Sequence, residues 1–282
     1  MSGKDFGPAQ APVRIAFGDG ERRRGAPSAQ VSDALDEVLA VRAAQVGRAA
    51  LEVVDVGAGT GGFAVRLAKL GHHVTVVDPS PDALAAARWR AAELGVTLTA
   101  VQGEASEIAG LVGDGAADLV VCHNVLEYVD SPAAAMAAIA RVLRPGGTVS
   151  VLAANVVAAV LQRALAGRYE EARRLLTSNA GDPVVPVPPS APAAAIPAPA
   201  APIPAPGVTE HRRFTLAGLT ALIEGAGLRA GDAHGVRIFA GLLPGGGADP
   251  AAADALRDLE AAAAGDPALR DIAARLHIFG HR

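Results

Sequence analysis

A glycine-rich turn that directly follows a short apolar run is the part of this sequence best suited to chemistry. The turn and the run before it comprise Val53, Val54, Asp55, Val56, Gly57, Ala58, Gly59, Thr60 and Gly61. Glycine lacks a Cβ, so a strand can turn at once into a helix, and a ligand can touch the main chain. The pattern predicts a ligand that contains adenosine. A dinucleotide fits this motif as well, and a purely structural turn is the remaining alternative.

An acidic residue follows the next predicted strand. Residues 73–77 are rich in β-branched side chains and end at Asp78, about twenty residues beyond the glycines. A carboxylate in this place accepts hydrogen bonds from both hydroxyls of a ribose. That arrangement serves NAD and S-adenosylmethionine equally, so Asp78 alone does not separate the two cofactors.

Three later segments decide between those cofactors. Glu104, Ala105 and Ser106 lie in a polar loop suited to an adenine edge, after a strand predicted at residues 96–101. A buried strand at residues 117–122 runs into His123. A helix from Ala133 then leads to the segment Leu143-Arg144-Pro145-Gly146-Gly147 and a strand at residues 148–153.

The whole series resembles the class I S-adenosylmethionine-dependent methyltransferases over roughly residues 51–153. Four features carry the resemblance: Asp55 with Gly57, Gly59 and Gly61; Asp78; the segment at His123; and the Leu-Arg-Pro-Gly-Gly turn. It implies S-adenosylmethionine as cofactor. It also implies an α/β, Rossmann-like fold: a seven-stranded mixed sheet with an antiparallel last strand and helices on both faces.

The chain divides into four stretches. Residues 1–50 are expected to be an N-terminal helical segment, and residues 51–176 a methyltransferase core with a helical insertion at 155–176. Residues 177–208 form a tether rich in proline and alanine, a composition that cannot build a helix or a sheet interior. Residues 209–282 complete the same fold, with a helix capped by Thr215, a strand around 236–239, a helix at 249–264 and a strand at 275–280.

Composition indicates the cellular setting. The 282 residues carry a formal net charge of -4 and no apolar run of about 18 residues. We therefore expect a cytoplasmic enzyme with no membrane span and no signal peptide. Cys122 is expected to be a buried hydrophobe. No metal site is expected, because the other histidines show no ligand spacing: His72, His73, His211, His234, His277 and His281.

Matches outside the cofactor motifs extend the resemblance to the bacterial tRNA 5-carboxymethoxyuridine methyltransferase group. They lie in His123–Tyr128, in residues 154–169, in Gly235–Phe239 and in the C-terminal segment. This resemblance implies that Gly57 and Ala58 contact the methionine part of the cofactor, Asp78 the ribose, Ala105 and Ser106 the adenine, and His123 its face. Pro79 and Glu104 belong to the same expected site. One of Arg22, Arg23 and Arg24 is expected to reach the cofactor carboxylate.

The resemblance also implies an acceptor. Arg237 matches the arginine that meets a substrate carboxylate, and a planar guanidinium pairs with a carboxylate through two parallel bonds. A carboxylate with a pKa of about 4 is ionised at neutral pH, so no general base is expected. A tRNA partner would need a local arginine patch, from Arg212, Arg213 and the arginines of residues 155–176. A small-molecule O- or N-methyltransferase and a non-catalytic cofactor-binding regulator remain open alternatives.

Overall fold

A computed structural model describes residues 29–178, 184–187, 211–242 and 250–282. Its centre is a seven-stranded sheet in the order β3-β2-β1-β4-β5-β9-β8. The strands are β1 (Glu52–Val56), β2 (His73–Asp78), β3 (Thr99–Gln102), β4 (Ala117–His123), β5 (Leu143–Ala154), β8 (Arg229–Val236) and β9 (Arg275–His281). β9 is antiparallel to both of its neighbours and the other neighbouring pairs are parallel, so the expected mixed sheet with an antiparallel last strand is confirmed.

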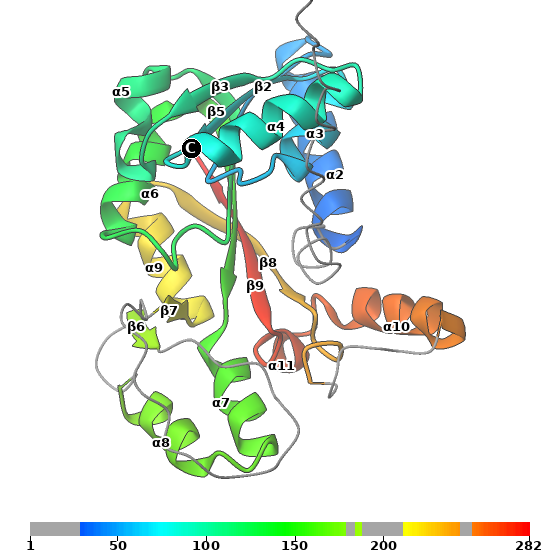
Figure 1. The fold of residues 1–282 in the computed structure, drawn as a ribbon, viewed down its shortest axis with the longest axis vertical. Coiled ribbons are helices and arrows are strands. Elements are labelled where there is room, and N and C mark those ends of the chain that lie inside the picture. The colour runs from blue at the N-terminus through cyan, green and yellow to red at the C-terminus, as the bar shows by residue number, and fades with distance from the viewer. Residues whose placement is uncertain (1–28, 179–183, 188–210, 243–249) are drawn as a thin grey trace, which may run out of the picture.

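Helices cover both faces of this sheet (Figure 1). On one face lie α2 (Ala29–Val46), α3 (Gly62–Lys69) and α4 (Pro81–Glu93), and on the other lie α5 (Ile108–Val112), α6 (Pro132–Val142) and α9 (Leu216–Gly225). Alternate residues of the strands serve the two cores: Val53 packs with the α2 and α3 side, and Val54 with the α6 and α9 side. Burial on both faces explains why the central strands read as continuous apolar runs.

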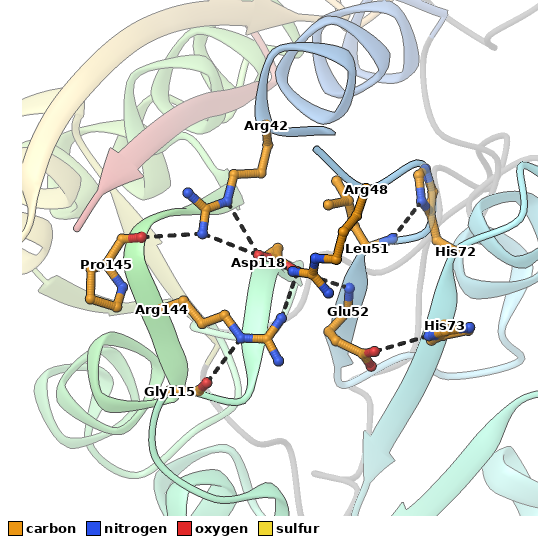
Figure 2. A network of polar contacts seen from close by, with 10 residues as sticks. All are labelled: Arg42, Arg48, Leu51, Glu52, His72, His73, Gly115, Asp118, Arg144 and Pro145. Carbon is orange, nitrogen blue, oxygen red and sulfur yellow. Dashed lines mark hydrogen bonds and ion pairs between the residues drawn. The ribbon is translucent and has the colours of Figure 1, made fainter. Parts of the chain in front are cut away.

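One buried aspartate ties α2 to the amino edge of the sheet (Figure 2). Asp118, at the start of β4, is 1% exposed and accepts hydrogen bonds from Arg42 of α2, from Arg48, and from Arg144 of β5. The backbone N–H of Glu52 donates to the same carboxylate at 3.1 Å. Arg144 belongs to the Leu-Arg-Pro-Gly-Gly segment, so that segment anchors the end of the sheet opposite the carboxyl ends of the parallel strands.

The insertion after β5 differs from the sequence expectation. Instead of one helix at residues 155–176, the structure has α7 (Val156–Leu165) and α8 (Tyr169–Ser178), which turn at Gly167 with φ of 75°. Asn155 caps α7 and also donates to the carbonyls of Asp271 and Ala273, at 2.9 and 2.8 Å. These bonds fix the start of the insertion to the segment before β9.

Part of the predicted tether is a strand. β6 (Val184–Val187) pairs antiparallel with β7 (His211–Phe214), so residues 184–187 correct the expectation of an unpaired proline-rich segment. Proline is tolerated in such a two-stranded edge, because its missing N–H costs a ladder bond only where a partner would accept it. Residues 177 and 178 of that tether belong to α8, and its residues 179–183 and 188–208 lie outside the described residues, as do Arg22, Arg23 and Arg24.

The C-terminal part contains α10 (Pro250–Ala263), α11 (Pro267–Arg270) and the strands β8 and β9. β8 ends at Val236, earlier than the strand predicted around residues 236–239. Glu260 of α10 accepts hydrogen bonds from the N–H groups of Ile238, Phe239 and Ala240, at 2.7 to 2.9 Å. A side-chain carboxylate therefore replaces the sheet ladder at these residues. Thr215 caps α9 as expected.

Candidate cofactor and acceptor site

A cavity of about 310 Å³ opens at the carboxyl edge of the sheet. Residues that follow four neighbouring strands line it: Val56, Gly57, Asp78, Pro79, Gly103, Glu104, Ala105, Asn124, Val125, Tyr128 and Val129. The carboxyl ends of parallel strands meet at one edge, and ligands of open α/β sheets bind there. Five predicted cofactor residues, Gly57, Asp78, Pro79, Glu104 and Ala105, are thus brought together on the cavity wall.

The first glycine of the turn is needed for space as well as for conformation. Gly57 has φ of 63°, and a Cβ placed on it would lie 2.5 Å from Cγ2 of Val125. Gly59 has φ of 52° and faces open space, with no atom within 4 Å of an added Cβ. The turn therefore offers a ligand an unobstructed stretch of main chain. Ala58 lies within this turn, and Gly61 caps the start of α3.

Asp78 connects the turn to the second strand. Its Oδ2 accepts the N–H of Gly59 at 2.9 Å, and its Oδ1 accepts the N–H of Ser80 at 2.9 Å. Each carboxylate oxygen keeps further acceptor capacity, since a carboxylate has about four lone-pair sites. The side chain is therefore oriented by the backbone at the cavity wall, where it can accept hydrogen bonds from a ligand.

Asp55 lies beneath the turn in the last residues of β1. Burial and, to a smaller extent, the nearby Asp78 carboxylate raise the pKa of Asp55 to about 7, although the N–H of Ala64 opposes the rise. Its Oδ2 is buried and has no hydrogen-bond partner among the described residues. Asp55 thus carries a negative charge or a proton according to small changes around it. A donor or a positive charge at the turn would favour the ionised form.

The adenine side of the site begins with a short 3-10 helix, η1 (Ala105–Glu107). Glu104 and Glu107 form a reciprocal capping box at its start, which holds the loop after β3 in place. Glu104 and Ala105 line the cavity. Ser106 is solvent-exposed and is not among the lining residues.

His123 ends β4 and is held by its neighbours. Its Nε2 lies 2.8 Å from Oγ of Ser150, which is also 2.8 Å from Nε2 of His277. Phe63 packs edge-on against the His123 ring, with ring centroids 5.2 Å apart. Burial and, to a smaller extent, the charge of Arg275 lower the pKa of His123 to about 3. The imidazole is therefore neutral at physiological pH, in keeping with a packing role.

The wall that follows β4 forms the far side of the cavity. Asn124 has φ of 58°, and Arg237 is the other non-glycine residue with positive φ in the described part of the chain. Nη1 of Arg275, at the start of β9, donates to Oδ1 of Asn124 and lies 3.9 Å from Oε1 of Glu127. Tyr128, which is 63% exposed, lines the cavity beyond them.

Glu127 itself is buried within this wall. Its Oε1 accepts the N–H of Ala154 at 2.7 Å, and its Oε2 has no hydrogen-bond partner among the described residues. Burial raises the pKa of Glu127, while the N–H groups of Glu127 and Ala154 and the charges of Arg275 and Arg213 oppose the rise. Sequence reasoning did not single out Arg275. An antiparallel last strand begins at the carboxyl edge, which is the signal that could have placed this residue near the cavity.

Arg237 lies at the same edge but farther along the sheet. It follows β8, and β9 and β5 stand between β8 and β4. Its side chain is exposed, its φ is 58°, and it is not among the residues that line the cavity. A positive φ costs a non-glycine residue about 1 to 3 kcal/mol and is concentrated at functional sites.

The arginines proposed for RNA contact are largely engaged. Arg163 is buried and lies 3.4 Å from Glu171, and Arg173 pairs with Glu170 at 3.0 Å. The Arg212 guanidinium donates to the carbonyl of Val129. Within the described residues no group of three or more His, Cys, Asp or Glu side chains could hold a metal ion. No helix of that part is long and apolar enough to cross a membrane.

Known proteins with similar sequences share this region. Residues 54–151 match the family model of the methyltransferase domain. The ubiquinone biosynthesis O-methyltransferase of Aeromonas salmonicida (strain A449) is 39% identical over 103 residues, 36% of this chain and 43% of that protein. The tRNA 5-carboxymethoxyuridine methyltransferase of Escherichia coli (strain K12) is 31% identical over 138 residues, 48% of this chain and 51% of that protein. The chain thus spans about half the length of the curated relatives it matches.

Solved structures show the same fold across more of the chain. A S-adenosylmethionine-dependent methyltransferase from Methanosarcina mazei aligns with a TM-score of 0.54 at 17% identity, over 83% of this chain and 93% of that one. Another methyltransferase, from Mesorhizobium loti, aligns with a TM-score of 0.50 at 21% identity, over 82% of this chain and 91% of that one. Residues 54–151 thus match a methyltransferase domain, the chain has the fold of these solved methyltransferases, and S-adenosylmethionine is the cofactor that the sequence predicts for it.

The cavity fits this cofactor. Gly59 leaves main chain open to a ligand, Asp78 is held at the cavity wall with acceptor capacity to spare, and Asp55 has a buried oxygen without a partner. An adenosine with two ribose hydroxyls and a charged amino-acid tail offers donors for these groups. None of these three features requires a dinucleotide as the ligand.

Proposed function

We propose that the protein transfers the methyl group of S-adenosylmethionine to a carboxylate oxygen of an acceptor, with a modified wobble uridine of tRNA as the candidate acceptor. Asp78 would hold the ribose, Ala105 and Ser106 the adenine, and Gly57 and Ala58 the methionine part, with His123 packing against the cofactor. The bound cofactor supplies an electrophilic methyl group on a positively charged sulfur.

The state of His123 is the observation that carries this proposal. A methyltransferase that acts on a neutral hydroxyl needs a group to accept its proton, and histidine serves this role most often. Here the imidazole has a pKa of about 3, and its Nε2 bonds to Ser150. A base with so low a pKa removes few protons at pH 7. An acceptor that is already ionised needs no such base.

A carboxylate satisfies this condition, because its pKa of about 4 leaves it ionised at neutral pH. An acceptor oxygen supplies the electron pair of the new carbon–oxygen bond, the methyl–sulfur bond breaks with its pair on sulfur, and no proton moves. The protein's contribution is then position and the exclusion of water. Such positioning lowers barriers by about 7 to 11 kcal/mol in favourable cases.

The chemistry of a methyl ester provides the test. Full-length protein and labelled S-adenosylmethionine would be incubated with total tRNA from cells that lack this protein, and separately with a pool of small carboxylic acids. Mild alkali releases the methyl group of an ester as volatile methanol, whereas methyl ethers and methylamines keep it. We expect alkali-labile label, and nucleoside mass analysis of the tRNA identifies its carrier. Incorporation of alkali-stable label alone rejects the proposal.

A second candidate is methylation of a neutral hydroxyl of a small molecule, with Glu127 as the base. The specific observation in its favour is that Oε2 of Glu127 is buried without a partner, and burial raises the pKa of this group. The similarity to ubiquinone biosynthesis O-methyltransferases agrees with this alternative. Its product would carry alkali-stable label, and Glu127→Gln would abolish the transfer.

A further inference from the structure

β7 lies behind the cavity wall that follows β4. The N–H of Arg212 donates to the carbonyl of Glu127 at 3.2 Å, and the Arg212 side chain donates to the carbonyl of Val129. Val129 lines the cavity. An isolated bridge between Asn155 and Phe214 joins the other end of β7 to the end of β5. β7 is therefore held at two places: by the cavity wall that follows β4, and by Asn155, the residue that follows β5.

Arg213 is the next residue of this strand. Successive side chains of a strand point to opposite faces, so Arg213 leaves β7 on the side opposite to Arg212. Its Nε is buried and has no hydrogen-bond partner among the described residues. Burial lowers the pKa of Arg213, and the charge of Arg163 lowers it further, whereas Glu127 raises it. Arg275 and Tyr128 also interact with its charge.

The charges in this cluster do not balance. Arg163 forms an ion pair with Glu171, with Nε and Oε2 3.4 Å apart. Arg213 and Arg275 share one carboxylate, Glu127, whose Oε1 is also bonded to the N–H of Ala154. Among the residues that the structure describes, one positive charge is left in excess, and the buried Nε–H of Arg213 has no acceptor. A buried N–H without an acceptor is costly, so a ligand or a water molecule usually completes such a group.

We propose that Arg213, with Arg275 beside it, binds the carboxylate of the methyl acceptor. The proposal rests on the function proposed above and adds the residue that selects the acceptor's charge. A planar guanidinium matches a carboxylate with two parallel hydrogen bonds and leaves other lone pairs of the carboxylate free for attack. Tyr128 and Asn124, on the cavity wall, place this subsite next to the cofactor cavity. Arg237, the arginine indicated by sequence resemblance, is the competing assignment.

A pair of probes that differ only in charge tests the assignment. 5-Carboxymethoxyuridine and its methyl ester would be titrated calorimetrically into full-length protein saturated with S-adenosylhomocysteine. We expect the wild type to bind the acid at least tenfold more tightly than the ester. Arg213→Met keeps side-chain length without charge and should bring the two affinities within about twofold of each other. Arg213→Lys should retain part of the preference, since it keeps the charge and loses the fork.

Two control variants isolate the effect. Arg141→Met removes an exposed arginine of α6 that pairs with Asp114, and it should preserve the wild-type preference. Arg237→Met tests the competing assignment in the same titration. Affinity for S-adenosylhomocysteine and the thermal midpoint provide a further readout. Because Nε of Arg213 has no acceptor among the described residues and Arg275 remains beside Glu127, the midpoint of Arg213→Met should lie close to that of the wild type.

The outcomes separate the two proposals. If the wild type does not prefer the acid and its transferred label is alkali-stable, the carboxylate function itself fails. If the wild type prefers the acid but Arg213→Met does so equally, the Arg213 assignment is overturned while the function stands. Loss of the preference in Arg237→Met alone transfers the role to Arg237. A lower midpoint with weakened cofactor binding in Arg213→Met makes Arg213 a structural residue and also overturns the assignment.

Discussion

At the residue scale, the glycine turn shows how one missing methyl group sets both shape and function. Gly57 and Gly47 have nearly equal φ values, 63° and 65°, so alanine strains the backbone similarly at either position. Only at Gly57 would the added Cβ meet another side chain, 2.5 Å from Val125. Val125 lines the cavity, so this collision displaces the cavity wall.

We therefore expect Gly57→Ala to weaken binding of S-adenosylhomocysteine at least tenfold, measured by calorimetry. Gly47→Ala should lower the thermal midpoint by a few degrees and leave the affinity within twofold of the wild type. Equal affinities in the two variants would show that the turn does not contact the cofactor.

The raised pKa of Asp55 predicts how the stability of the protein depends on pH. The pKa of Asp55 is raised to about 7, so the folded protein holds a proton that the unfolded chain, with a carboxyl pKa of about 4, releases earlier. Stability from this group is fully present below about pH 4 and is lost as pH rises to about 7. Asp55→Asn keeps the shape and removes the titration. Between pH 5 and 8 its free energy of unfolding should fall by about 2 to 3 kcal/mol less than that of the wild type.

Urea unfolding at several pH values measures this difference in apoprotein. Identical slopes for the wild type and Asp55→Asn between pH 5 and 8 would contradict the raised pKa. The pH window separates Asp55 from ordinary carboxyl groups, which titrate near pH 4.

At the element scale, the attachment of α2 depends on Asp118. Burial raises the pKa of Asp118, but the N–H of Glu52 and the charges of Arg144, Arg42 and Arg48 outweigh this, so the net shift is downward. A lowered pKa gives stability that is present above the unfolded value of about 4 and lost as pH falls through the folded value. Asp118→Asn removes the negative charge of the side chain to which all three arginines bond in Figure 2.

We expect Asp118→Asn to cost about 3 kcal/mol of unfolding free energy at pH 7, the scale of a buried pair that loses one partner. The difference from wild type should shrink below pH 4. Asp114→Asn is the matched control: its side chain is 60% exposed and pairs with Arg141, so it should cost less than about 1 kcal/mol. A cost for Asp118→Asn no larger than this control would mean that the network does not hold α2.

Individual helices and strands show which parts of the fold the sequence could predict. Runs of valine and leucine in β1, β4 and β5 report burial on both faces, so these strands and their parallel order were predictable. The break between α7 and α8 also had a local signal in Gly167. The end of β8 had no local signal in the sequence. It depends on Glu260, which lies 22 residues beyond Ile238 in the chain. The pairing of β6 with β7 likewise joins residues that lie far apart in sequence, such as Val184 and Phe214.

At the scale of the whole molecule, the cofactor side and the acceptor side come from different parts of the chain. The cofactor residues follow β1 to β4 in sequence order, so a local motif predicts them. The acceptor side combines the segment after β4 with Arg213 of β7 and Arg275 of β9. Strand order brings Arg275 to this edge, and the contacts of β7 with Glu127 and Asn155 bring Arg213 there. Residues 179–183 and 188–208 of the predicted tether lie outside the described residues.

The dependence of the transfer rate on pH tests the central claim most directly. A carboxylate acceptor ionises far below neutrality, so the wild-type rate should stay within about twofold from pH 6 to 8. The cofactor must be saturating, because the titration of Asp55 near pH 7 can alter its affinity. The account predicts this flat profile together with alkali-labile product. A rate that climbs about tenfold per pH unit, with alkali-stable product, would contradict it and favour a hydroxyl or amine acceptor.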